Sequence, residues 1–180
     1  MIEKMQKIDI CVVGDVSVGK SSLIASLKKQ KNSIPPTIGV EVDFYKYGTY
    51  KLCFWDTSGQ SDFRDFIGSY YKKANVIVVV VSIKDIRRAQ YWYDTVMSIV
   101  PDTPIILCIN KIDLYVNKIV HVPVFVKNIP FAHIFLTSMY IREKTLTQCL
   151  DTLITYAPVH PPVSISKPKV EESINCCTII

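Results

Sequence analysis

The sequence predicts an α/β fold built on an open, mostly parallel sheet. Three observations support this prediction: apolar strand-like runs recur along the chain, segments with helical spacing lie between them, and a glycine-rich loop follows the first run. The 180 residues, of which 49% are hydrophobic, suffice for one domain that buries its own core. We therefore expect three layers, α/β/α, with ligands bound at the carboxyl ends of the strands.

The first half of the chain predicts a strand, a helix and a strand pair. Residues 8–13 form an almost continuous apolar run, as in a strand buried on both faces of a sheet. Apolar residues at helical spacing follow over 20–29, and two prolines at the end of 31–36 then exclude a helix. Residues 37–46 and 50–55 are rich in β-branched and aromatic side chains around a glycine turn, which predicts two paired strands.

The middle of the chain repeats the alternation. Residues 60–74 mix polar and aromatic side chains and predict a mobile helical segment. The valines within 75–82 predict a buried strand, and apolar residues at helical spacing over 86–100 predict the next helix. Residues 105–109 predict another buried strand. The segment 120–128 stays ambiguous, because its β-branched residues oppose the helix that the alternation favours.

Two further elements complete the predicted domain, and the composition then changes. Residues 134–136 predict a sixth strand, and helical spacing over 146–154 predicts the last helix. From Pro158 onward, prolines lie among serine, lysine and glutamate with few large apolar residues, as in a disordered tail. We therefore divide the chain into a domain over 1–157 and a tail over 158–180.

The bulk composition narrows the classes of function. The formal net charge is +5 without an interleaved basic and aromatic stripe, so we expect no nucleic-acid partner. The longest apolar run, residues 76–81, is too short to cross a bilayer. Residues 1–7 lack the apolar core of a signal peptide, and four isolated cysteines resemble buried hydrophobes. These features predict a cytoplasmic protein, and nothing in the sequence demands more than a monomer.

The strongest motif is the segment GDVSVGKS at residues 14–21. It fits the phosphate-binding pattern of a glycine, four residues and Gly-Lys-Ser/Thr without a mismatch. The glycines let backbone N–H groups point at an anion, Lys20 can reach the β- and γ-phosphates, and Ser21 can ligate Mg²⁺. The expected nucleotide contacts in this stretch are Val16, Ser17, Val18, Gly19, Lys20, Ser21 and Ser22.

A second motif, residues 56–60, follows the strand predicted at 50–55. Asp56 can hold Mg²⁺ directly or through water, and Gly59 can bring its N–H against a γ-phosphate because no side chain blocks the approach. Gln60 can orient the attacking water as the catalytic residue, since an amide both donates and accepts hydrogen bonds. By itself this segment is a weak signal, and an ordinary turn would be the better interpretation.

A third motif follows the strand predicted at 105–109. Asp113 can accept a pair of N–H donors from guanine, which adenine cannot offer, while Asn110 can reach the other edge of the base. The stem of Lys111 can cover the ring. Ser138 and Met139, after the last strand, can close the same pocket with backbone N–H groups. Each piece alone is also compatible with a surface loop.

The order and spacing of these motifs resemble the Ras superfamily of small GTPases over roughly residues 7–156. Within that range, 37–41, 51–57 and 70–74 resemble hallmarks of the Rab subfamily, and Cys176-Cys177 resembles the double-cysteine prenylation signal of Rab proteins. The resemblance implies a P-loop NTPase fold with a six-stranded sheet. It also implies a slow GTPase that acts as a molecular switch in vesicle or membrane traffic.

The resemblance carries further expectations about ligands and partners. Mg²⁺ and GTP would order one segment around Thr37 and another over 59–74, with Thr37 ligating the metal beside Ser21. The partners would be effectors, an exchange factor, a GTPase-activating protein and the prenylation machinery. Lipid on Cys176 and Cys177 would anchor the protein to the cytoplasmic face of an intracellular membrane. Alternatively, the last four residues form a single prenylation box, and Cys176 receives palmitate.

The sequence departs from the family pattern at several positions. Val16 stands where relatives usually carry Gly or Ser, so we expect slow hydrolysis. No aromatic residue lies between Ser21 and Thr37 to pack on the base, so we expect fast GDP release; such contacts are worth about 1–3 kcal/mol. Ser61 and the Met139-Tyr140 pair are smaller departures, at positions that touch regulators and the base.

Two other functions remain open at this point. Val16 motivates the first, a nucleotide-gated scaffold that binds GTP but barely hydrolyses it, although Gln60 favours an enzyme. The second is another P-loop enzyme such as a small ATP-dependent kinase, against which the segment 110–113 counts.

Overall fold

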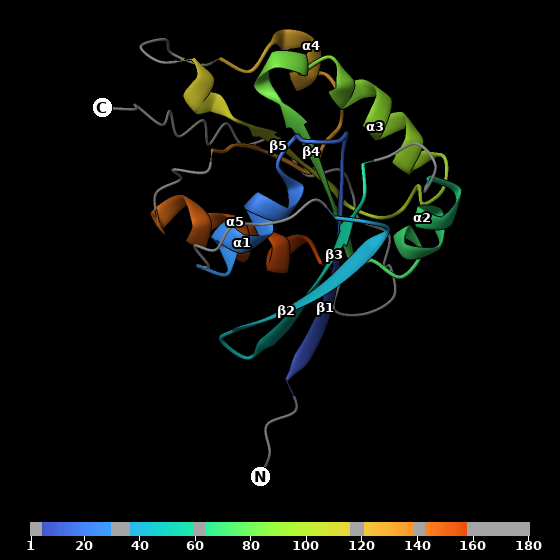
Figure 1. Cartoon of the computed structure of the whole chain (residues 1–180), viewed down its shortest axis with the longest axis vertical. Coiled ribbons are helices and arrows are strands. Elements are labelled where there is room, and N and C mark those ends of the chain that lie inside the picture. The colour runs from blue at the N-terminus through green and yellow to red at the C-terminus, as the bar shows by residue number, and fades with distance from the viewer. Residues whose placement is uncertain (1–4, 30–36, 60–63, 116–120, 139–142, 158–180) are drawn as a thin grey trace.

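A six-stranded sheet forms the centre of the computed structural model. The structure describes residues 5–29, 37–59, 64–115, 121–138 and 143–157. The strands are β1 (Gln6–Val13), β2 (Val40–Tyr47), β3 (Tyr50–Thr57), β4 (Val76–Ser82), β5 (Ile105–Asn110) and β6 (His133–Leu136). Their order is β2-β3-β1-β4-β5-β6, and only the β2–β3 pair is antiparallel (Figure 1). The predicted fold class is confirmed.

Helices cover both faces of this sheet. The helices are α1 (Lys20–Leu27), α2 (Arg64–Tyr71), α3 (Arg88–Met97), α4 (Val124–Lys127) and α5 (Glu143–Tyr156), with short 3₁₀ turns η2 (Ile83–Asp85) and η3 (Ile112–Leu114). Figure 1 shows α1 and α5 on one side of the sheet and α2 and α3 on the other. The three-layer arrangement therefore follows from the alternation of strands and helices along the chain.

A hydrophobic core lies on each face of the sheet, and this explains why the central strands are apolar throughout. Alternate residues of a strand point to opposite faces, and on β4 Val78 packs into the core with α1 and α5 while Val79 packs into the core with α3. Both valines are almost completely buried, and so are their neighbours on β1 and β5. A strand covered by helices on both sides has no position left for a polar residue.

Some boundaries differ from those expected. The strand predicted from Thr37 begins at Val40, and the ambiguous segment 120–128 contains only the four-residue helix α4, which starts after Pro123. A proline fixes its own φ and lacks an N–H, so it suits the residue before a helix. The predicted linker 31–36 and tail 158–180 lie outside the described residues, so the domain division stays a prediction. Of the helices that are described, none is long and apolar enough to cross a membrane.

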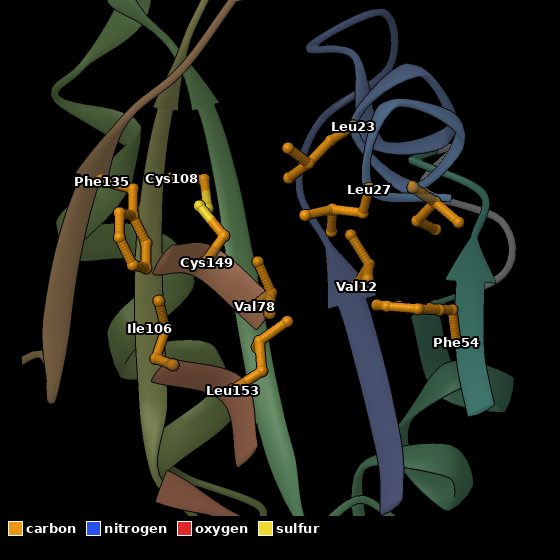
Figure 2. Close-up of a pocket in the computed structure, with 11 residues that line it drawn as sticks. Val12, Leu23, Leu27, Phe54, Val78, Ile106, Cys108, Phe135, Cys149 and Leu153 are labelled. Atoms are coloured by element: carbon orange, nitrogen blue, oxygen red, sulfur yellow. The ribbon is translucent and has the colours of Figure 1, made fainter. Parts of the chain in front are cut away.

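A small apolar cavity of about 10 Å³ lies between the sheet and the helices α1 and α5. Figure 2 shows side chains from β1, β3, β4, β5, β6, α1 and α5 around it. The buried thiols of Cys108 and Cys149 belong to its wall, and burial raises the pKa of Cys108 well above its ordinary value. A space of this size is a packing gap in the core and has no polar lining to hold a ligand.

We expect the change Leu153→Ala to lower the free energy of unfolding by about 2–5 kcal/mol, because it enlarges this cavity. Leu153 is 3% exposed and lines the gap from α5. Urea denaturation followed by circular dichroism measures the effect. The control is Lys144→Ala on the exposed side of the same helix, where a change within about 0.5 kcal/mol is expected. Equal losses in the two variants would contradict this account of the core.

Candidate functional site: a phosphate cradle at the strand ends

The loop between β1 and α1 lies tightly against the carboxyl ends of two other strands. A Cβ at Gly14 (φ +148°) would lie 2.1 Å from the carbonyl oxygen of Val80, two residues before the end of β4. A Cβ at Gly19 (φ +98°) would lie 2.4 Å from Nδ2 of Asn110, at the end of β5. At Gly14 the neighbouring atom belongs to the backbone and leaves no room for a Cβ; at Gly19 the positive φ favours glycine, and a Cβ would also displace the amide of Asn110.

The end of the loop at Ser17 and Val18 is held by the residues expected to bind the base. Asn110 donates from Nδ2 to the carbonyl of Val18 (2.9 Å), and Lys111 donates from Nζ to the carbonyl of Ser17 (2.5 Å). Thr137 donates to Oδ1 of Asn110 (3.1 Å), which ties the end of β6 to the same network. Asn110 thus joins the phosphate loop to two strand ends. Its expected contact with the base stays a prediction.

Lys20 lies inside the loop with 7% of its surface exposed. Its Nζ donates to the carbonyls of Gly14 (3.0 Å) and Asp15 (2.8 Å). Burial lowers the pKa of Lys20, and the carboxylates of Asp56 and Asp15 oppose that shift. The ammonium group is therefore held at the place where an anion would enter the loop, as its motif position predicts.

The three predicted Mg²⁺ ligands meet beside the loop. Ser21 donates to Oδ2 of Asp56, Thr37 donates to the same oxygen (3.1 Å), and the two hydroxyls lie 3.0 Å apart. The other carboxylate oxygen, Oδ1, is buried and has no hydrogen-bond partner among the described residues. Burial raises the pKa of Asp56, while the two hydroxyls and Lys20 counter this effect. An orphaned carboxylate oxygen between hydroxyls fits a hard divalent cation such as Mg²⁺.

Gly59 completes the cradle from the chain that follows β3. A Cβ on this residue would lie 2.4 Å from the carbonyl carbon of Asp15 and 2.4 Å from the nitrogen of Val16. Its backbone is therefore pressed against the phosphate loop, where a γ-phosphate would be expected. Val16 itself is 57% exposed. Gln60, the next residue and the expected catalytic group, lies outside the described residues.

The loops after β5 and β6 form the expected base pocket. Asp113 lies half-buried in η3, and the N–H of Ile112 donates to the carbonyl of Thr137 (3.2 Å). Ser138 follows directly and is half-buried. These contacts place Asp113, the carboxylate predicted to select guanine, next to the loop expected to close over the base. The remaining predicted residues, Met139, Cys176 and Cys177, fall in parts of the chain that the structure does not describe, and Ser22 lies exposed in the first turn of α1.

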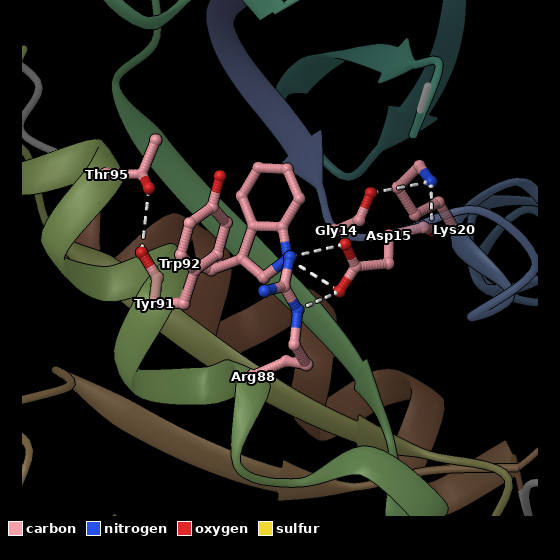
Figure 3. Close-up of polar contacts among 7 residues, drawn as sticks. All are labelled: Gly14, Asp15, Lys20, Arg88, Tyr91, Trp92 and Thr95. Atoms are coloured by element: carbon pink, nitrogen blue, oxygen red, sulfur yellow. Dashed lines mark hydrogen bonds and ion pairs between the residues drawn. The ribbon is translucent and has the colours of Figure 1, made fainter. Parts of the chain in front are cut away.

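Sequence reasoning missed one group of residues at this site. Arg88 and Trp92 of α3 both donate to the carboxylate of Asp15 in the phosphate loop (Figure 3). Their spacing of four residues on a predicted helix gives them a common face. This spacing was the signal available in the sequence. It does not identify the acceptor, because Asp15 lies 73 residues before Arg88 in the chain.

The fold and this cradle define a P-loop GTPase domain of the Ras superfamily. A family model described as "Ras of Complex, Roc, domain of DAPkinase" matches residues 9–113, which is more than half of the chain. The chain belongs to this Roc family.

Several relatives have similar sequences. The mouse Ras-related protein Rab-36 is 33% identical over 97 residues, 49% of this chain and 36% of that protein. The GTP-binding protein YPTM1 of Zea mays is 33% identical over 121 residues, 62% of this chain and 58% of that protein. The mitochondrial Rho GTPase 1 of Schizosaccharomyces pombe is 34% identical over 114 residues, 59% and 18% of the two chains. The matched region thus spans less than two thirds of each relative.

A solved structure shares the fold. The RocCORdC structure of Methanosarcina barkeri Roco2 bound to GDP superposes with a TM-score of 0.66 at 20% identity, covering 84% of this chain and 50% of that one.

We expect the change Gly59→Ala to slow GTP hydrolysis about a hundredfold, because the new methyl group forces the Gly59 N–H away from the loop. Single-turnover phosphate release measures the rate. Gly68→Ala is the matched control, since a Cβ there makes an ordinary contact of 3.5 Å with Ile99. Our account of Gly59 is wrong if the two alanine variants hydrolyse GTP at the same rate.

Proposed function

We propose that this protein is a Rab-like switch that binds GTP and GDP, hydrolyses GTP slowly, and regulates vesicle or membrane traffic. The observation that carries this proposal is the meeting of the three Rab-like segments on one surface. Glu41 of β2 lies opposite Asp56 of β3 in the strand register, and the ring of Trp55 lies 5.1 Å from the ring of Tyr70 in α2. The similarity to Rab-36 and to the YPT proteins supports the same assignment.

This surface is built to report the state of the nucleotide. Trp55 immediately precedes Asp56 in β3, and β2 begins three residues after Thr37. Each of the two strands is therefore directly connected along the chain to a proposed metal ligand. Val42 is 43% exposed and Ile38 is 79% exposed, which leaves apolar area for an effector protein. Ordering or releasing Thr37 would therefore change the surface that an effector binds.

The chemistry of the proposed reaction follows from the cradle. Lys20 would exchange its two carbonyl partners for phosphate oxygens, and the N–H of Gly59 would donate to the γ-phosphate. Ser21, Thr37 and Asp56 would hold Mg²⁺, which neutralises phosphate charge when bound. Gln60 would orient the attacking water, and Asp113 would select guanine over adenine. Preference for GTP over ATP in a competition experiment tests this assignment against a kinase.

The tail provides a test of the proposed membrane role. We expect a tagged protein to lie on an intracellular membrane. The double variant Cys176→Ser/Cys177→Ser should be diffuse, because it lacks both cysteines that would carry the lipid, and even a single lipid chain binds a membrane only marginally. Fluorescence microscopy of the full chain measures this. If wild type and double variant are equally diffuse, the lipid anchor is refuted.

The single variants distinguish the two lipidation schemes. Under double prenylation, mass spectrometry of either single variant finds one prenyl chain. Under the single-box scheme, Cys177→Ser removes prenylation completely, while Cys176→Ser removes only the palmitate.

A second candidate function, a GTP-bound scaffold with impaired hydrolysis, rests on Val16. Its nitrogen is the atom that a Cβ on Gly59 would meet at 2.4 Å, so the valine lies beside the backbone that leads into Gln60. A branched side chain at this point occupies space that a catalytic water or an incoming arginine would need.

We expect the change Val16→Gly to raise the single-turnover rate of GTP hydrolysis about tenfold, which corresponds to about 1.4 kcal/mol in the barrier. The GDP off-rate of the same variant is the internal control and is expected to stay unchanged. A rate no faster than that of wild type refutes the obstruction by Val16. A wild-type protein that is already fast, alone or with an activating protein, refutes the scaffold.

A further inference from the structure

One carboxylate of the phosphate loop points away from the nucleotide cradle and toward α3 (Figure 3). Arg88 donates from Nε to Oδ2 of Asp15 and from Nη2 to Oδ1, both at 2.8 Å. Trp92 adds a third hydrogen bond from Nε1 to Oδ2 at 3.1 Å. Two parallel bonds from a guanidinium group fix the angle of a carboxylate as well as its distance. Asp15 is therefore held in one orientation by α3.

The donors themselves are held in place by α3 and its core. Trp92 is 3% exposed, and Ala89 between the two donors is fully buried in the core against β4. The guanidinium carbon of Arg88 lies 3.9 Å from the ring centroid of Tyr91. A cation over an aromatic face is attracted to it, which restricts the otherwise flexible arginine. Arg88 and Trp92, which together form the clamp on Asp15, are thus held in place by the hydrophobic core of the domain.

The backbone of the same aspartate lies at the phosphate end of the cradle. Its carbonyl accepts the hydrogen bond from Lys20, and the peptide between Asp15 and Val16 is the backbone against which Gly59 rests. Asp15 therefore joins three parts of the domain: α3 through its side chain, and Lys20 and the Gly59 segment through its backbone.

We propose that Arg88 and Trp92 are positioning residues that act through Asp15 on the γ-phosphate end of the nucleotide. The inference rests on the proposed binding of GTP. The two donors do not touch the nucleotide; they fix the peptide that Lys20 and Gly59 contact.

The inference predicts that loosening Asp15 affects the binding of GTP more than the binding of GDP. The other end of the loop, Ser17 and Val18, is held by Lys111 and Asn110 and does not depend on α3. Loosening Asp15 should therefore weaken contacts to the third phosphate and leave contacts to the first two largely intact. A residue that only stabilised the fold would affect both nucleotides equally.

The test uses the full chain and two labelled nucleotides, GDP and a non-hydrolysable GTP analogue. We expect Arg88→Gln to raise the off-rate of the GTP analogue about tenfold and that of GDP less than threefold. Arg87→Gln is the matched control, because Arg87 is exposed and makes none of the three hydrogen bonds to Asp15, and neither off-rate should change. Arg88→Lys keeps the charge without the two-pronged geometry and is expected to fall between Arg88→Gln and wild type.

The isosteric change Asp15→Asn keeps the test decisive if Arg88→Gln folds poorly, because it alters the same contact without removing volume. The double variant should be no worse than the more affected single variant, since both changes act through one contact. Equal effects on GDP and the GTP analogue, or no effect beyond that of Arg87→Gln, overturn the inference. Failure of the wild-type protein to bind either nucleotide overturns the proposed function instead.

Discussion

The close packing of the phosphate loop onto the ends of β4 and β5 is the constraint on which the site depends. Gly14 lies against the carbonyl of Val80, which leaves no room for a Cβ, and Gly19 lies against the amide of Asn110, which a Cβ would displace. The loop can take up its curvature because β4, which pairs with β1, and β5, the next strand, end at the same level. The sheet order makes this possible, since β1 lies between β3 and β4 and every crossover returns to the same edge.

The same geometry explains why distant motifs meet. Asp56 is the penultimate residue of β3, next to β1, so its carboxylate reaches Ser21 without any long side chain. Asn110 ends β5, one strand further away, and reaches the loop only through its amide on Val18. Burial of Asp56 then leaves Oδ1 without a partner in the described part of the chain, at a cost that a bound cation would offset. The order of the strands thus determines which polar side chains reach the phosphate loop.

The sequence predicted the elements and motifs that depend on local residue patterns. It did not predict the features that depend on contacts between distant parts of the chain. The strand at 75–82 and the phosphate loop were predictable, because apolar runs and fixed glycine spacing carry their own physical reason. The short helix α4 was not, since β-branched residues left both structures open until Pro123 and the packing of Val126 decided. The contact of Arg88 with Asp15 was hidden for a different reason: a charged residue on a helix is usually solvated, and its partner lies far away in sequence.

The two ends of the phosphate loop are supported by different elements, and this separation suits a switch. The end at Ser17 and Val18 is tied to Asn110 and Lys111, which are predicted to bind the base, so it should sense which nucleotide is present. The end at Asp15 is tied to α3 and pressed against Gly59, so it should sense whether a third phosphate is present. A rigid loop held at one point would transmit both signals together. In the proposed switch, support from two sides would let the guanine nucleotide stay bound after hydrolysis while Gly59 is released, which is the asymmetry that such a switch requires.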